Sequence, residues 1–334
     1  MTVKMVTVHE KDDGVRLDRW FSRYYPDLKN GQLQRLLRGK NIKVNGAKAT
    51  ADQRLKTGDI LRIPPLEVSE KSNLPRKLSK GDVEFMQSLV IYKDEDVIVL
   101  NKPSGIAVQG GSGQTRHIDG MLDALRFEKD EKPRLVHRLD KDTSGILLLG
   151  RSAKAAAKLA ESFASRDAQK IYWALVYGKP KLLTGKVNAP LSKMSGEGGG
   201  ELMRVDTQNG QKAQTLYRVV DSLAKKASWL EMMPLSGRTH QLRVHAASVL
   251  NTPIVGDGRY FDKTREKMGL ADENKLHLHA RAIKIPHPTK GMLEIYAKIP
   301  QHIMNSFEFL GFDEKQSDNP FDHFDKDADK KGRK

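Results

Sequence analysis

The sequence predicts an α+β protein with two domains. Its length of 334 residues exceeds that of most single domains. A polar stretch that begins at Pro64-Pro65 separates a short basic unit from a much larger one. The larger unit contains many short β-like runs with helical segments between them. Because strands and helices do not alternate regularly there, the pattern favours the α+β class over a parallel α/β sheet.

Residues 1–65 are predicted to form the first domain. Apolar side chains recur at helical spacing over residues 17–21 and again over 33–37, so we expect two short amphipathic helices. Asn45-Gly46 is a typical hairpin turn between strands. The run over 60–63 is expected to close this small domain as a final strand.

The first domain is strongly basic. Residues 14–63 contain 12 Lys or Arg and 4 Asp or Glu, and the whole chain carries a formal net charge of +16. A protein this basic usually binds a polyanion, which leaves nucleic acid, an anionic membrane surface or an acidic protein as candidates. The second helix and the turn after it present cations that suit phosphate contacts, namely Arg35, Arg38, Lys40 and Lys43.

Three segments are expected after the first domain: a flexible linker over 66–85, a large domain over 86–310 and a disordered tail over 311–334. The linker is polar, and the tail has few apolar residues and nearly balanced charges. In the large domain we expect strands near 97–100, 146–149, 171–177, 216–220, 229–233, 282–285 and 292–299, helices near 117–126, 152–166 and 239–250, and a mobile loop tip at 195–200.

Composition excludes several classes of site. The chain has no cysteine, which removes disulfides, thiolate nucleophiles, zinc–thiolate sites and iron–sulfur clusters. It has no apolar stretch of transmembrane length and no signal peptide at its start. We therefore expect a cytoplasmic protein that does not enter a membrane.

The segment from His137 to Gly145 is the most informative in the chain. It places Asp140 directly after Arg138 and Leu139 and just before a Thr-Ser-Gly turn, and an apolar run over 146–149 follows. This layout predicts a reactive loop held by a buried strand. By itself, an Asp in this position is more often a turn residue or a helix cap.

The first domain resembles the S4 RNA-binding domain. The similarity lies in the segments Arg16-Leu17-Asp18, Gln34 to Lys40, Lys43 to Gly46 and Leu55 to Asp59. The resemblance implies that this small domain adds affinity for RNA, and it agrees with the local charge. The alternative is that these cations only form a solvated helix surface.

Most of the large domain resembles the pseudouridine synthases of the RluA type, which modify structured RNA. Three separated motifs carry the similarity: 137–145, 170–176 and 237–245. Several motifs in one order are far more specific than one motif alone. Asn101-Lys102-Pro103-Ser104-Gly105, Pro253 with Gly256-Asp257, and His287-Pro288 support it, and the segment 101–113 is closest to the large-subunit ribosomal enzymes of the RluC branch. The resemblance implies a mixed, largely antiparallel sheet flanked by helices.

The resemblance also implies the site and its chemistry, the isomerisation of uridine. It makes Asp140 the essential carboxylate, which either attacks the ribose C1′ or removes the 2′ proton, and it pairs Arg243 with Asp140. Burial alone favours a protonated carboxyl, and a cation beside it reverses that preference. Tyr172 would stack on the uracil and assist proton transfer. Arg138 would fill the space that a flipped base leaves, and His137 is expected to take part with it in base flipping or RNA binding.

Each of these residues also has a plainer interpretation. Tyr172 alternates with apolar residues, so it could pack in the core. Arg243 could be an exposed helix charge, and Arg138 could bind phosphate or pair with an acid. A non-catalytic RNA chaperone that keeps the fold is the competing hypothesis, and tRNA is the competing substrate.

No metal or other cofactor is expected, because the implied reaction involves no redox change, phosphoryl transfer or hydrolysis. His240 with His245, or His277 with His279, could bind a metal, but clustered carboxylates and cysteines do not accompany them. A serine hydrolase is disfavoured because no Gly-x-Ser-x-Gly segment occurs. The expected partner is large-subunit ribosomal RNA or a pre-ribosomal particle, bound by a monomer.

Overall fold

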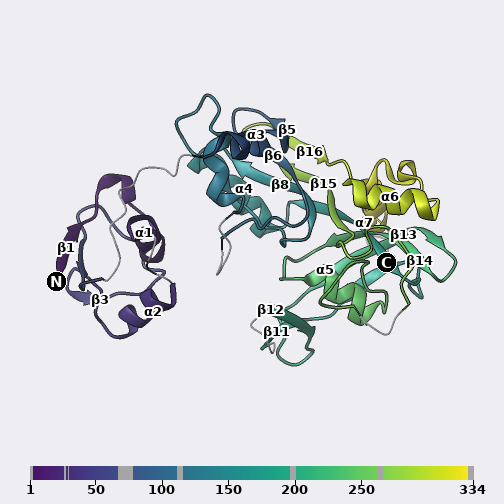
Figure 1. Ribbon diagram of the computed structural model, residues 1–334, viewed down its shortest axis with the longest axis horizontal. Helices are drawn as coiled ribbons and strands as arrows, with labels where there is room; N and C mark the ends of the chain where they lie inside the picture. Colours follow the sequence, from purple (N-terminus) through teal and green to yellow (C-terminus); the bar gives the residue numbers. More distant parts are fainter. Residues whose placement is uncertain are drawn as a thin grey trace. The chain divides into compact units, whose positions relative to one another are not determined.

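The computed structural model describes residues 3–25, 28, 30–66, 78–110, 116–195, 201–261 and 266–329. The chain divides into two compact units, with the boundary between residues 77 and 78 (Figure 1). Helix α3 (Lys80–Ser88) opens the second unit, so this part of the predicted linker is helical. Most of the remaining linker lies outside the described residues.

The first unit is a four-stranded antiparallel sheet covered by two helices. Its strands lie in the order β1-β4-β2-β3, and the chain also forms a short 3-10 helix, η1. Asn45 and Gly46 both have positive φ, as the predicted two-residue turn requires. The helices bury Leu17, Trp20 and Phe21 from α1 and Leu33 and Leu37 from α2. The elements are β1 (Lys4–Thr7), η1 (Glu10–Asp12), α1 (Leu17–Tyr24), α2 (Asn30–Arg38), β2 (Lys43–Val44), β3 (Ala47–Lys48) and β4 (Ile60–Ile63).

The second unit is built on one large mixed sheet with the strand order β10-β13-β14-β9-β15-β8-β6-β5, and β16 and β7 pair with β15 and β8. Among the described strands only β15 and β8 pair in parallel. The predicted, largely antiparallel sheet is thus confirmed. The bounds are β5 (Val90–Lys93), β6 (Val97–Lys102), β7 (Arg134–Leu135), β8 (Ser144–Gly150), β9 (Gln169–Tyr177), β10 (Thr184–Asn188), β13 (Gln214–Leu223), β14 (Ala227–Pro234), β15 (Leu278–Pro286) and β16 (Met292–Tyr296).

Helices cover the two ends of this sheet. Helices α3, α4 (Ala153–Ser165) and η2 (Asp119–Leu125) lie at the end formed by β5, β6 and β8, and α6 (Gln301–Leu310) lies at the end with β13 and β14 (Figure 1). Helix α4 begins where Ser152 accepts a hydrogen bond from the Ala155 amide at 3.1 Å, as an N-cap does. The hairpin of β11 (Leu191–Ser195) and β12 (Glu201–Val205) lies beside α5 (Gln241–Val244).

Two sequence predictions about helices are only partly met. The segment predicted over 117–126 forms the 3-10 helix η2, and the segment over 239–250 divides into α5 and a π-helical turn, η3 (His245–Val249). Residues 196–200 of the predicted loop tip lie outside the described residues, and β11 ends at Ser195.

The disordered tail predicted over 311–334 is wrong for the part that the structure describes. After a 3-10 turn, η4 (Glu314–Ser317), the chain forms α7 (Pro320–Asp329). Phe321 and Phe324 are buried against the core around Trp173 and Trp229. Since two aromatic side chains three residues apart share one helix face, they provide the apolar burial that the charged composition concealed.

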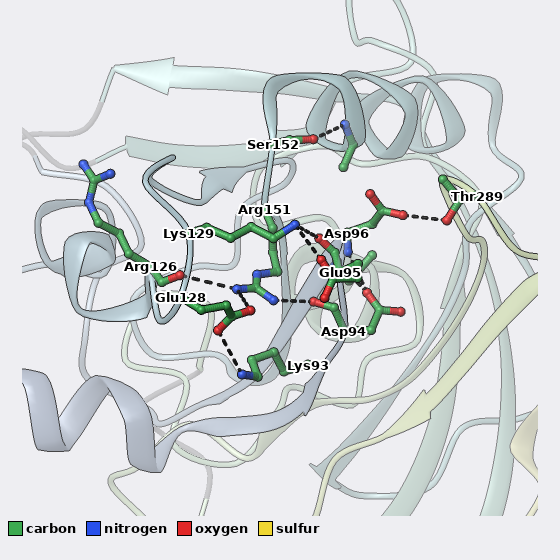
Figure 2. Close-up of polar contacts among 12 residues, drawn as sticks. Lys93, Asp94, Glu95, Asp96, Arg126, Glu128, Lys129, Arg151, Ser152 and Thr289 are labelled. Carbon is green, nitrogen blue, oxygen red and sulfur yellow. Dashed lines mark hydrogen bonds and ion pairs between the residues drawn. The ribbon is translucent and has the colours of Figure 1, made fainter.

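Arg151 fixes the end of β8 remote from Asp140 (Figure 2). This side chain is 1 % exposed, and its guanidinium donates to the Asp94 carbonyl at 2.6 Å and to Glu128 Oε1 at 2.6 Å. Lys129 donates to the Glu95 carbonyl in the same turn. Strand β8, in the interior of the sheet, is therefore fixed at the end that lies away from the predicted reactive loop.

Candidate active site

The loop that carries Asp140 joins β7 to β8 and is held by a buried lysine. Lys102, at the end of β6, is fully buried, and its Nζ donates to the carbonyls of Pro103, Ile106 and Lys141, each at 2.9 Å. Burial lowers the pKa of Lys102 to about 7, although the charges of the nearby Asp142 and Asp140 oppose this shift. The contact to the Lys141 carbonyl fixes the backbone directly after Asp140.

The start of β8 fixes the other side of the same loop. Gly145 has φ +106°, and a Cβ there would lie 2.3 Å from the Ala280 carbonyl oxygen, so only glycine fits. The Ser144 hydroxyl lies 2.9 Å from His279 Nδ1, and His279 Nε2 faces the Ala297 carbonyl. Since a carbonyl can only accept, Nε2 carries the proton and Ser144 donates to Nδ1.

Arg243 on α5 faces two carboxylates at different distances. Its Nε and Nη2 donate to Asp257 at 2.8 and 2.6 Å, which is a bidentate pair. Its Nη1 lies 3.7 Å from Asp140 Oδ2. Burial lowers the pKa of Arg243, but the hydrogen bond and the charge of Asp257 raise it further, so the net shift is upward. The implied Arg243–Asp140 pair is present as a secondary contact.

Tyr172 on β9 both packs against the core and faces the cleft. It is partly buried and contacts two clusters of buried apolar side chains. It also lines the cleft that contains Asp140. Burial, with a smaller contribution from the Asp140 charge, raises the pKa of Tyr172 above its ordinary value. Its hydroxyl is therefore a neutral proton donor at physiological pH.

One cleft of about 1130 Å³ brings these side chains together. Among the described residues that line it, Asp140 is the single acid, and six side chains are Lys or Arg: Arg138, Lys141, Arg166, Lys170, Arg238 and Arg243. Such a wall of cations attracts a polyanion and surrounds this carboxylate with positive charge.

The two residues before Leu139 differ in their surroundings. Arg138 is exposed at the cleft and forms no ion pair within the part of the chain that the structure describes. His137 instead accepts a hydrogen bond from the Leu148 amide at 2.9 Å and stacks on Phe163 with ring centroids 4.6 Å apart. Burial lowers the pKa of His137 to about 3, so this ring is neutral and helps to hold the loop.

The predicted RNA-binding cations of the first unit lie on one side of α2 and on the strand that follows. Arg35, Arg38 and Lys40 are exposed and Lys43 is half-buried. Within the described ranges none of the four forms an ion pair with an acid. All four charges remain available to phosphate.

Sequence reasoning missed four residues near the site. Asp257 was noted only within a supporting motif, and Lys102 only beside Pro103. His240 was considered only as a metal ligand, and Tyr260 was not noted. Each acts through a contact with a residue distant in the chain, and the sequence signal at each is a polar side chain beside an apolar run. The described residues contain no cluster of three or more potential metal ligands, and none of their helices is long and apolar enough to cross a bilayer.

The fold and the cleft suit a protein that acts on a polyanion, because cations surround the single described carboxylate of the cleft. Residues 96–248 match the RNA pseudouridylate synthase family. The chain is 36 % identical over 296 residues to ribosomal large subunit pseudouridine synthase C of Haemophilus influenzae, covering 87 % of this chain and 89 % of that protein. It is 33 % identical to RNA pseudouridine synthase 4, mitochondrial, of Arabidopsis thaliana, covering 92 % of this chain and 81 % of the relative.

The fold is also similar to that of a solved structure from the same family. Human RNA pseudouridylate synthase domain containing 4 aligns with a TM-score of 0.59 and 28 % identity, covering 70 % of this chain and 98 % of that chain. The chain therefore belongs to the RNA pseudouridine synthase family, whose members are isomerases that act on RNA.

Proposed function

We propose that this protein converts specific uridines of large-subunit ribosomal RNA to pseudouridine, with Asp140 as the catalytic carboxylate. One observation carries the proposal: Asp140 is the single acid among the described residues of a cationic cleft. Its side chain is 31 % exposed, so it is accessible to a nucleotide that enters the cleft. The naming of the bacterial relatives as large-subunit enzymes supports the choice of RNA.

The reaction breaks the bond between uracil N1 and ribose C1′ and forms a bond between C5 and C1′. Asp140 either attacks C1′ or removes the 2′ proton, and both routes use its ionised form, which lies 3.7 Å from the Arg243 guanidinium. The proton on C5 is lost and N1 gains one, so no oxidant and no cofactor is consumed. Tyr172, neutral and next to Asp140, is the candidate for one of these transfers.

A stacked uridine must leave its helix before Asp140 can reach C1′, at a cost of a few kcal/mol. Arg138 is exposed at the cleft two residues before Asp140, and its planar guanidinium can stack on the bases beside the gap. We assign Arg138 this role, and we assign Arg35, Arg38, Lys40 and Lys43 of the first unit, as an S4-like domain, the binding of RNA phosphates.

The test maps pseudouridines across total RNA from cells with and without this protein, and from cells that express Asp140→Asn. We expect pseudouridines in large-subunit ribosomal RNA that depend on the protein and disappear with the variant. Asp167→Asn, which changes an exposed carboxylate beside the cleft, should leave them intact. Sites confined to tRNA would refute the substrate, and pseudouridine that persists with Asp140→Asn would refute the role of Asp140 and leave the RNA chaperone hypothesis open.

A further inference from the structure

His240 lies directly beside the candidate catalytic carboxylate. It precedes α5 by one residue, and its Nε2 is 3.9 Å from Asp140 Oδ2. Arg243 Nη1 approaches the same oxygen at 3.7 Å. Two nitrogens thus converge on Oδ2, and the second carboxylate oxygen, Oδ1, is left for a substrate. His240 has φ +52°, a left-handed conformation that needs a structural reason in a non-glycine residue.

The other nitrogen of this imidazole is held by a chain of hydrogen bonds. The Met203 amide, on β12, donates to the Tyr260 hydroxyl oxygen at 3.0 Å. That hydroxyl lies 2.7 Å from His240 Nδ1. With its oxygen accepting from the Met203 amide, the hydroxyl proton is free to point to Nδ1, and a neutral imidazole that accepts at Nδ1 carries its proton on Nε2.

We propose that His240 is a positioning residue for Asp140: Tyr260 fixes its tautomer, and its Nε2–H is aimed at Oδ2 beside the Arg243 guanidinium. This inference rests on the proposed role of Asp140. The distance of 3.9 Å is longer than a hydrogen bond, and it shortens to one when a nucleotide closes the site, as catalytic contacts commonly do. The imidazole then fixes the direction of the carboxylate and stabilises its ionised form.

Several charged groups face this pair. Arg243, Arg259 and Asp257 act on His240 in addition to Asp140, while Lys102 and Tyr172 lie near the carboxylate. Burial lowers the pKa of His240, the Asp140 charge opposes this, and the two arginines add to the lowering, with a net downward shift. His240 is therefore neutral near pH 7, as a donor with a fixed tautomer must be.

The proposal is tested with His240→Asn and His240→Gln. The amide of Gln places an N–H close to the position of Nε2, whereas Asn is too short to do so. Asn tolerates the left-handed backbone, so His240→Asn is expected to fold. Because a hydrogen bond to a charged group is removed, we expect kcat of His240→Asn to fall about 10- to 100-fold on a transcript of large-subunit ribosomal RNA.

The pH profile separates this role from a merely structural one. An ionised carboxylate that loses a donor is protonated more easily, so its pKa rises. The acidic limb of kcat/KM against pH should therefore move upward by about one unit in His240→Asn, and return in His240→Gln. Tyr260→Phe should give a smaller fall in kcat, because the tautomer is no longer fixed. Tyr217→Phe, which removes a hydroxyl that donates to the Leu182 carbonyl, is the matched control and should match the wild type.

An unchanged kcat and acidic limb in His240→Asn, with a wild-type Tm, would overturn the proposal. So would a Gln variant that behaves like the Asn variant. The proposed function is tested separately in the same assay by Asp140→Asn. If Asp140→Asn is active, the catalytic role of Asp140 is wrong. If Asp140→Asn is inactive and both His240 variants are unaffected, only the inference about His240 is wrong.

Discussion

Two carboxylates lie near the Arg243 guanidinium, and they contact it at different distances. One is Asp140, in the loop before β8, and the other is Asp257. Asp257 is 1 % exposed and binds Arg243 through two hydrogen bonds. It also accepts from the amides of Arg259 and Tyr260. Asp140 is about a third exposed and lies 3.7 Å from the same arginine.

The difference separates a carboxylate that holds Arg243 from the one that we propose is catalytic. Both oxygens of Asp257 accept a hydrogen bond from Arg243, so this residue holds Arg243 in place. Asp140 receives the electrostatic effect of Arg243 without a close bidentate bond, so it stays accessible. A catalytic carboxylate needs a positioned cation beside it and an oxygen that a substrate can reach. Asp257 positions the cation, and Asp140 is the accessible carboxylate.

The largest effect is expected when the reactive carboxylate is neutralised. Asp140→Asn should lower kcat by about 10⁴-fold or more, because the group that reacts at the ribose is lost. The Tm should change little, since the side chain is partly exposed and makes no short hydrogen bond. Single-turnover assays and calorimetry measure the two quantities. A large drop in Tm would show that Asp140, like Asp257, stabilises the fold. The proposed contrast between the two carboxylates would then be wrong.

Replacing Asp257 should mainly lower the stability of the fold, whereas replacing Asp140 should mainly lower activity. Asp257→Asn removes the close, buried anion of Arg243 and leaves only Asp140 at 3.7 Å, which costs about 3 kcal/mol of unfolding free energy. Denaturant unfolding of the variant measures that cost. Activity should fall as well, because Arg243 is no longer held. Full stability with lost activity would instead place Asp257 in the chemistry.

Changing the shared arginine sharpens the distinction. Arg243→Lys keeps the charge near Asp140 but cannot form the forked pair with Asp257. We expect kcat to fall about 100-fold through misplacement of the cation. RNA affinity, measured by filter binding, should be nearly unchanged. Wild-type kcat would mean that charge alone suffices and that the fork is unimportant.

The smallest effect on chemistry is expected far from both carboxylates. Replacing Arg35, Arg38, Lys40 and Lys43 together by Ala removes exposed charges of the first unit. The slope of log binding constant against log salt should become shallower by about 3, and single-turnover kcat at saturating RNA should be retained. An unchanged slope would contradict RNA binding by this unit.

Local patterns predicted most of the elements. Short apolar runs located β6, β8, β9 and β14, because a strand that is buried on both faces is apolar at nearly every position. The same reasoning failed over 311–329. There the charged residues dominate the composition, and the two phenylalanines that hold α7 are separated by only one helical turn. A pattern of two apolar residues is too short to distinguish from chance.

Motif order indicated which residues belong to the site, and the structure places Asp140, Tyr172 and Arg243 on one cleft. The contacts themselves could not be derived in this way. The resemblance paired Arg243 with Asp140, whereas its close partner is Asp257, 14 residues further along the chain. The link from Met203 to His240 through Tyr260 joins three separate segments.

The sequence by itself determined the class of the fold, the basic character of the protein and the residue types available for catalysis, since these follow from local periodicity, composition and short motifs. Only the tertiary structure decided which carboxylate binds Arg243 closely and which stays accessible in the cleft. The physical reason is that hydrogen bonds and burial depend on distances between segments far apart in the chain, and no linear pattern records those distances.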